Sequence, residues 1–81
     1  MKYGLRIESR ALKDLRRLDK RLSKRIVDRI EIMAEDLTGD VKKLTDHSPQ
    51  YRLRIGDYRV LFDIEDETIV IQRIRNGREV Y

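Results

Sequence analysis

The chain contains no cysteine, one histidine and one proline. The lack of cysteine excludes disulfides, thiolate catalysis and a cysteine-based zinc site. The single His47 argues against a histidine-based metal site, because structural zinc needs four protein ligands. No stretch approaches the length of a membrane span, and the N-terminal MKYGLRIESR lacks the apolar region of a signal peptide. We therefore expect a soluble, cytoplasmic protein with no metal, no cofactor and no membrane partner.

Charge is abundant where other features are scarce. Charged residues make up 42% of the 81 positions, and the net charge is +4. This length predicts a single domain over residues 1–81, with a small core. The positive balance favours polyanionic partners, and nine Lys or Arg side chains lie between residues 10 and 29. An ordinary solvated helix surface remains an alternative explanation of that basic segment.

Two helices are predicted between residues 9 and 37. Three leucines recur at helical spacing after Ser9, which is a candidate N-cap. Asp19 can cap a second helix, whose apolar stripe continues in steps of three and four residues to Leu37. Gly39 lies near the expected C-terminal cap. These two helices are expected to form an α-helical hairpin.

Alternating apolar residues predict strands at residues 3–7, 51–55 and 58–64. A nearly continuous apolar run predicts a last strand at residues 68–74, and residues 41–50 are expected to form a loop. The element order is therefore β-α-α-β-β-β. Placing the helical hairpin on one face of a sheet buries both apolar surfaces. The expected fold class is α+β, a small antiparallel β-sheet with an N-terminal α-helical hairpin packed on one face.

The segment YRLRIGDYRV predicts a β-hairpin with the two-residue turn Gly56-Asp57. In that register Arg54 lies directly opposite Arg59, and Arg52 lies one step along on the same face. Like charges placed opposite each other destabilise a sheet. The guanidinium groups therefore need anions, either a carboxylate such as Asp63 or the phosphates of a partner.

The apolar members of the hairpin share the other face, which is expected to pack under the helices: Tyr51, Leu53, Ile55, Tyr58, Val60 and Phe62. Whether Arg73 and Arg75 join the arginine face depends on the turn at residues 65–67, which the sequence leaves open. Arginine forks suit phosphate and can stabilise a phosphorane-like transition state. RNA carries its own 2′-OH nucleophile, so metal-free cleavage by such a face would favour RNA over DNA.

The segments YRLRIGDYRVLFDI, ALKDLRRL, KKLTD and the ending REVY together resemble the RelE branch of the RelE/ParE toxin superfamily. The resemblance implies a RelE-like fold and the toxin of a type II toxin–antitoxin pair. It further implies a metal-free endoribonuclease that enters the A site of the 30S ribosome, cuts mRNA and leaves a 2′,3′-cyclic phosphate. The implied partners are the ribosome, mRNA and a RelB-like antitoxin. The toxin would be a monomer alone and a hetero-oligomer with the antitoxin.

By this resemblance the catalytic residues are Arg52, Arg54, Arg59, Arg75 and Tyr81. The first two would activate the 2′-OH and hold the phosphate. The later arginines would stabilise the transition state or assist the leaving group, and the tyrosine would stack on or orient the cleaved nucleotide. Relatives often carry lysine in the first two positions. Arginine does not give up its proton in proteins, so a phenolate or the ribosome itself would accept the proton of the 2′-OH.

Other basic residues are expected to bind ribosomal RNA through phosphate contacts. These are Arg16, Arg17, Lys20, Arg21, Lys24, Arg25, Lys42, Lys43, Arg73 and Arg78. Two alternatives remain open. The chain could be a ParE-like inhibitor of DNA gyrase, or a catalytically inactive homologue that only binds an antitoxin.

Overall fold

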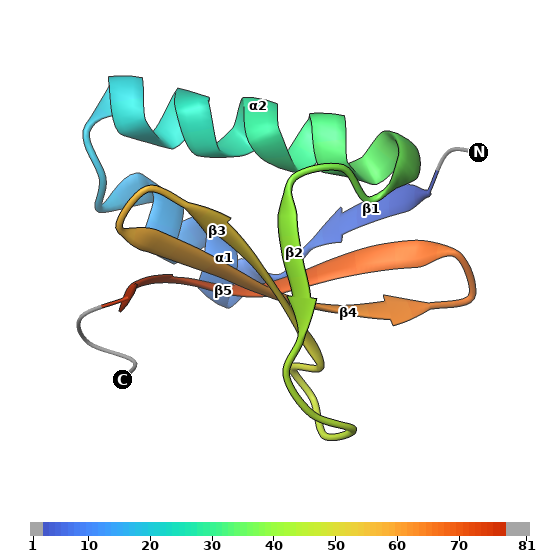
Figure 1. The fold of residues 1–81 in the computed structure, drawn as a ribbon. Helices are drawn as coiled ribbons and strands as arrows, with labels where there is room; N and C mark the ends of the chain where they lie inside the picture. Colours follow the sequence, from blue (N-terminus) through green and yellow to red (C-terminus); the bar gives the residue numbers. More distant parts are fainter. Residues whose placement is uncertain (1–2, 78–81) are drawn as a thin grey trace.

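The computed structural model describes residues 3–77, and Figure 1 shows their arrangement. The elements are, in chain order, β1 (Gly4–Ile7), α1 (Ser9–Arg16), α2 (Lys20–Asp36), β2 (Asp40–Lys43), β3 (Tyr51–Ile55), β4 (Tyr58–Glu65) and β5 (Thr68–Asn76). The α+β class and the order of the predicted elements are confirmed. One further strand, β2, lies within the segment expected to be a loop. Its sequence DVKK has a single apolar residue, so no alternation marks it as a strand.

The five strands form one sheet in the order β1-β5-β4-β3-β2. Strands β2 to β5 are antiparallel neighbours. The sequence predicts this pairing for β3, β4 and β5, and β2 adds a further antiparallel strand beside β3. Strand β1 differs, because it pairs with β5 in parallel, with Gly4 opposite Thr68. A parallel neighbour requires a long crossover connection. The helices supply the first part of that connection, since the chain leaves β1 through α1 and α2 and returns to its neighbour β5 only as the last strand.

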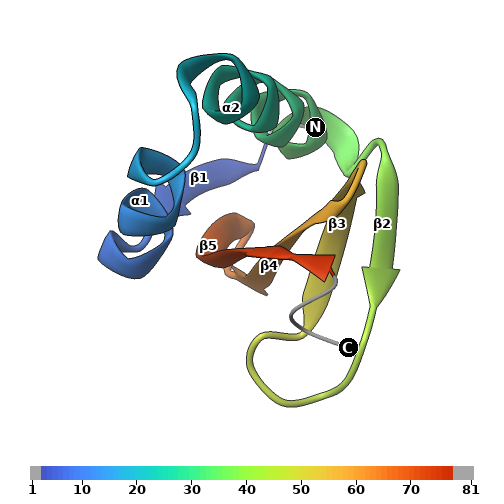
Figure 2. The same ribbon diagram turned by 90° about the vertical axis from the view of Figure 1, so that its left-hand side faces the viewer.

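Both helices cover one side of the sheet, with α1 beside β5 (Figure 2). The core between the layers contains the side chains predicted for the hairpin's inner face: Leu53, Ile55, Val60 and Phe62 are all buried. Tyr51 stacks on Phe62 from the neighbouring strand, with ring centroids 5.4 Å apart. The predicted packing of this face under the helices is therefore confirmed. Within residues 3–77, no helix is long and apolar enough to cross a membrane.

The helix ends follow the sequence in part. Asp19 caps α2 as predicted, since its Oδ1 accepts a hydrogen bond from the Leu22 N–H at 2.9 Å. Ser9 is the first residue of α1 rather than its cap, because Glu8 is the extended residue whose backbone oxygen accepts the first helical hydrogen bond, from the Leu12 N–H. Helix α2 ends in a left-handed residue at Leu37, two positions before the predicted Gly39.

The hairpin turn is the one the sequence predicts. Gly56 adopts a φ of +58°, a conformation in which glycine has no steric cost. Ile55 consequently pairs with Tyr58, and Arg54 lies directly opposite Arg59. The turn therefore places the two arginines in facing positions on adjacent strands.

Candidate functional site

Three arginines occupy facing positions on adjacent strands. Arg54 on β3 pairs with Arg59 on β4, and Arg59 pairs in turn with Arg75 on β5. We call these residues the arginine row. Facing residues of antiparallel strands have Cα atoms about 4.5–5.5 Å apart, so the row concentrates three positive charges in a short span. The register that the sequence left open therefore places Arg75 on the arginine face.

Arg52 lies outside the row and is engaged by strand β2. Its Nη1 donates to the backbone oxygen of Asp40 at 2.8 Å and lies 3.1 Å from Oδ1 of the same residue. Only 15% of its side chain is exposed. Asp40 lies opposite Arg54 on the neighbouring strand, at the β2 end of the row. The positive charge of Arg52 therefore compensates the negative charge of the Asp40 carboxylate there. Its predicted catalytic role stays a prediction.

Arg73 faces Leu61 and turns toward helix α1. Its Nε and Nη2 donate to the Asp14 carboxylate at 2.9 and 3.2 Å. This ion pair ties β5 to α1 and raises the pKa of Arg73 through the hydrogen bond to Asp14. Arg73 thus contributes to the framework around the row, while its predicted contact with RNA remains untested.

The Asp14 carboxylate joins α1 to the edge of β5 beyond the end of β1. It is 9% exposed, and Oδ2 also accepts the backbone N–H of Ile74 at 2.9 Å. Burial alone would raise the pKa of Asp14. The hydrogen bonds from Arg73 and Ile74, together with the charges of Arg73 and Arg75, outweigh burial and hold that pKa below its ordinary value. Asp14 therefore fixes the backbone immediately before Arg75.

Among residues 3–77, Asp63 pairs with no arginine, which corrects the sequence expectation. Its carboxylate is buried and accepts hydrogen bonds from the Ser48 hydroxyl, the Gln50 N–H at 2.7 Å and the Gln72 amide at 3.2 Å. A register shift between β4 and β5 leaves Gln72 as an extra residue in β5. This shift places an amide beside Asp63, and the carboxylate anchors the loop before β3 instead of neutralising the row.

The lack of a side chain at Gly77 leaves room for the Arg59 guanidinium. A Cβ atom at this position would lie 3.0 Å from Cζ and 3.1 Å from both terminal nitrogens of Arg59. The Gly77 N–H also donates to the Asp57 oxygen at 2.6 Å, which ties the end of β5 to the hairpin turn. The sequence alone does not predict this role for Gly77, because the contact depends on the pairing of β4 with β5.

A cleft of about 260 Å³ opens between the end of α1 and strand β5. Arg17, Tyr58 and Arg75 line it, together with the Asp14–Arg73 ion pair. The cleft links the β5 end of the arginine row to the basic helices. No group of three or more His, Cys, Asp or Glu side chains within residues 3–77 is placed to share a metal ion.

The basic helix residues lie on the surface, as an RNA-binding role requires: Arg16, Arg17, Lys20, Arg21, Lys24 and Arg25 are exposed. Helix α2 has no acidic residue in its first turn and no basic residue in its last. Apart from the Asp19 cap, this distribution opposes the helix dipole, which favours acids at the N-terminus and bases at the C-terminus. The arrangement costs stability, which is consistent with a functional use of these charges.

The remaining predicted RNA contacts have mixed surroundings. Lys42 is exposed on β2, whereas Lys43 lies 3.1 Å from Asp46, whose hydrogen bond raises the pKa of this lysine. Arg78 and Tyr81 lie outside the described residues. The roles predicted for all of these residues therefore stay predictions.

The chain resembles several known toxins. The curated relative "Toxin RelE3" of Methanocaldococcus jannaschii is 31% identical over 75 residues, which cover 86% of this chain and 85% of the relative. The structure is similar to that of the toxin–antitoxin complex RelBE2 of Mycobacterium tuberculosis, with a TM-score of 0.82, 26% identity and coverage of 94% and 92% of the two chains. The similarity to the RelE–RelB complex of Pyrococcus horikoshii has a TM-score of 0.79 and 28% identity. It covers 95% of this chain and 97% of that chain.

The fold, the arginine row and these similarities together identify the chain as a small basic toxin of the RelE type. Residues 5–81 match the family described as "ParE toxin of type II toxin-antitoxin system, parDE". The chain belongs to this family, and within the RelE/ParE superfamily its curated relatives and structural neighbours are RelE toxins.

Proposed function

We propose that this toxin is a ribosome-dependent endoribonuclease that cuts mRNA in the ribosomal A site. The arginine row carries the proposal, because three guanidinium groups on adjacent strands match the charge that develops during phosphodiester cleavage. Attack by the 2′-oxygen on the adjacent phosphorus forms a five-coordinate phosphorane with one more negative charge than the substrate. Charges that bind this state more strongly than the substrate lower the barrier.

In the proposed reaction the 2′-OH loses its proton, its oxygen forms a bond to phosphorus, and the bond to the 5′-oxygen breaks. The leaving 5′-oxygen takes up a proton, so the products are a 2′,3′-cyclic phosphate and a 5′-hydroxyl. Arg59 is central in the row and would contact the equatorial phosphoryl oxygens, with Arg54 and Arg75 on either side. The row supplies charge and no base, since arginine stays protonated. A phenolate or the ribosome itself would accept the proton of the 2′-OH. Tyr81 would stack on the cleaved nucleotide.

A RelB-like antitoxin is the proposed partner. The neighbours from Mycobacterium tuberculosis and Pyrococcus horikoshii were solved as RelBE2 and RelE–RelB complexes, and this chain shares their fold over nearly its whole length. The toxin would be a monomer in the cytoplasm when active on ribosomes. It would be a hetero-oligomer when bound to its antitoxin.

Inhibition of DNA gyrase is the second candidate function, because the matched family is described as a ParE toxin. Induced expression of the toxin alone separates the two. Our proposal predicts that expression arrests growth, with cleaved mRNA and intact DNA. In a separate assay, purified toxin should leave supercoiling by DNA gyrase normal. Stalled gyrase with intact mRNA would favour the ParE reading. An absence of any growth effect would favour an inactive antitoxin-binding homologue.

The basic face of α2 supplies a prediction about ribosome binding. Replacing both Lys24 and Arg25 by alanine should weaken binding to empty ribosomes and reduce the slope of log K against log salt by roughly two, because each lost phosphate contact releases about one counterion fewer. Binding is measured by sedimentation at several salt concentrations. The matched control removes Arg10 and Lys13 from α1, which should leave the slope nearly unchanged. Equal slopes for both double variants would contradict the assignment.

A further inference from the structure

Ile32, on the outer side of α2, is unusually open to solvent for an apolar residue. It is 54% exposed, more than any other large apolar side chain among residues 3–77. Two hollows of the surface meet at this side chain, one toward β3 and one along the outer side of the helix. Ile32 is therefore the apolar centre of a surface that continues in two directions.

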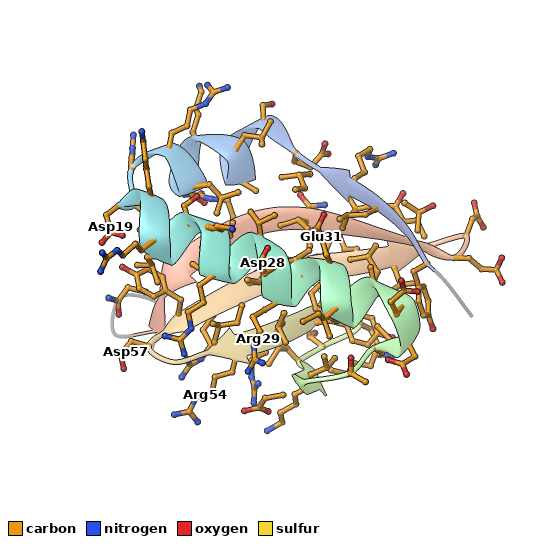
Figure 3. The ribbon with its side chains drawn as sticks, turned by 90° about the horizontal axis from the view of Figure 1, so that it is seen from above. Asp19, Asp28, Arg29, Glu31, Arg54 and Asp57 are labelled. Atoms are coloured by element: carbon orange, nitrogen blue, oxygen red, sulfur yellow. The ribbon has the colours of Figure 1, made fainter. Side chains whose placement is uncertain are left out.

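The first hollow is positively charged. It has a volume of about 140 Å³, and Arg29 of α2 and Arg54 of the arginine row line it together with Ile32 and Leu53. Figure 3 shows Arg29 and Arg54 on the same side of α2. Within residues 3–77, neither guanidinium has a carboxylate at ion-pair distance. Asp40 also borders the hollow, but its carboxylate is already held by Arg52.

The second hollow is acidic. Asp28 and Glu31 line it together with Ile32 and Glu35. In Figure 3, Glu31 lies on the side of α2 opposite Arg54, and Asp28 lies on top of the helix between the two sides. The surface across α2 is therefore positive at Arg29 and Arg54, apolar at Ile32, and negative at Asp28 and Glu31. An RNA backbone is negative throughout and would be repelled at the negative part of this surface.

We propose that this surface, comprising Arg29, Ile32, Arg54, Asp28 and Glu31, docks a segment of the antitoxin. The segment would place an acidic side chain between Arg29 and Arg54, an apolar side chain on Ile32 and a basic side chain over Asp28 and Glu31. Charge complementarity in this order would select the partner and fix the position of its segment along the surface. Because Arg54 belongs to the arginine row, the acidic side chain would neutralise part of the catalytic charge. The inference rests on the proposed antitoxin partner.

The test uses the polypeptide encoded beside the toxin gene and measures its Kd by isothermal titration calorimetry. Arg29→Glu and Ile32→Ser should each raise the Kd by about tenfold or more, as expected for residues near the centre of an interface. Arg10→Glu and Leu12→Ser make the same chemical changes on α1 and should alter the Kd by less than about twofold. Circular dichroism verifies that each variant folds.

Ribosomal mRNA cleavage is measured on the same proteins. If Arg29→Glu lost cleavage while its affinity for the antitoxin stayed unchanged, the hollow would bind RNA phosphate and the proposal would be overturned. Unchanged Kd values for both variants would also overturn it, as would a wild-type toxin that binds no such polypeptide. A wild-type toxin that binds the polypeptide with the predicted variant effects but cuts no mRNA would refute the nuclease and uphold this docking surface.

Discussion

Replacing Arg59 by alanine is expected to slow mRNA cleavage by about a hundredfold to a thousandfold, the loss typical of removing one donor that stabilises an oxyanionic transition state. Arg59 has a facing arginine on either side and packs against Gly77, so no other described side chain occupies its central position. The measurement is the single-turnover rate on programmed ribosomes with saturating toxin. Arg59→Lys should recover part of the rate, because lysine keeps the charge and loses the fork.

The control for this prediction is Arg6→Ala. Arg6 is an exposed arginine on β1 that lies 3.9 Å from Glu8 and from Glu65, on the opposite edge of the sheet from β2. Its removal changes the net charge as much as the Arg59 variant does and should leave the rate within about twofold. A rate loss of similar size in both variants would mean that general charge, rather than the row, drives the effect.

Replacing Asp14 by alanine is expected to lower the free energy of unfolding by about 2–3 kcal/mol, because the Ile74 N–H loses its acceptor and Arg73 loses its counterion. This loss of unfolding free energy is smaller than is typical for a fully buried ion pair, because a third of the Arg73 side chain is exposed. Urea denaturation measures the change. Asp14→Asn keeps an acceptor for Ile74 without the charge, so it should lose less. Equal stability of all three proteins would contradict the framework role of this carboxylate.

The same carboxylate should make stability depend on pH. The pKa of Asp14 is lower in the folded protein than its ordinary value of 3.8. The folded state therefore binds its proton less readily, and the stabilisation is present above about pH 4 and disappears as pH falls through the folded pKa. Between about pH 5 and 2, the wild type should lose more stability than Asp14→Asn. Parallel pH profiles for the two proteins would contradict this account.

The sequence predicts the features of the site that depend on local rules. A Gly-Asp turn between alternating strands fixes the pairing of Arg54 with Arg59, and the structure confirms it. The cap at Asp19 follows equally from short-range hydrogen bonding. These features depend on residues only a few positions apart, so a pattern within one segment is sufficient to predict them.

Features that depend on distant pairings were not predictable in the same way. The turn before β5 and the register shift at Gln72 determine that Arg75 joins the row and that Asp63 meets amide and hydroxyl groups. The ion pair between Asp14 and Arg73 joins residues 59 positions apart. The closeness of Arg29 to Arg54 arises from the packing of α2 on the sheet. None of these contacts has a signature within its own segment.

The most direct test of the central claim uses purified ribosomes stalled with an empty A site on a defined mRNA. The wild-type toxin and Arg59→Ala are added with and without ribosomes, and primer extension maps the new RNA ends. We predict a cut within the A-site codon that appears only with ribosomes and wild-type toxin. Intact mRNA under every condition would contradict the proposed nuclease, and cleavage of naked RNA would remove the ribosome from its mechanism.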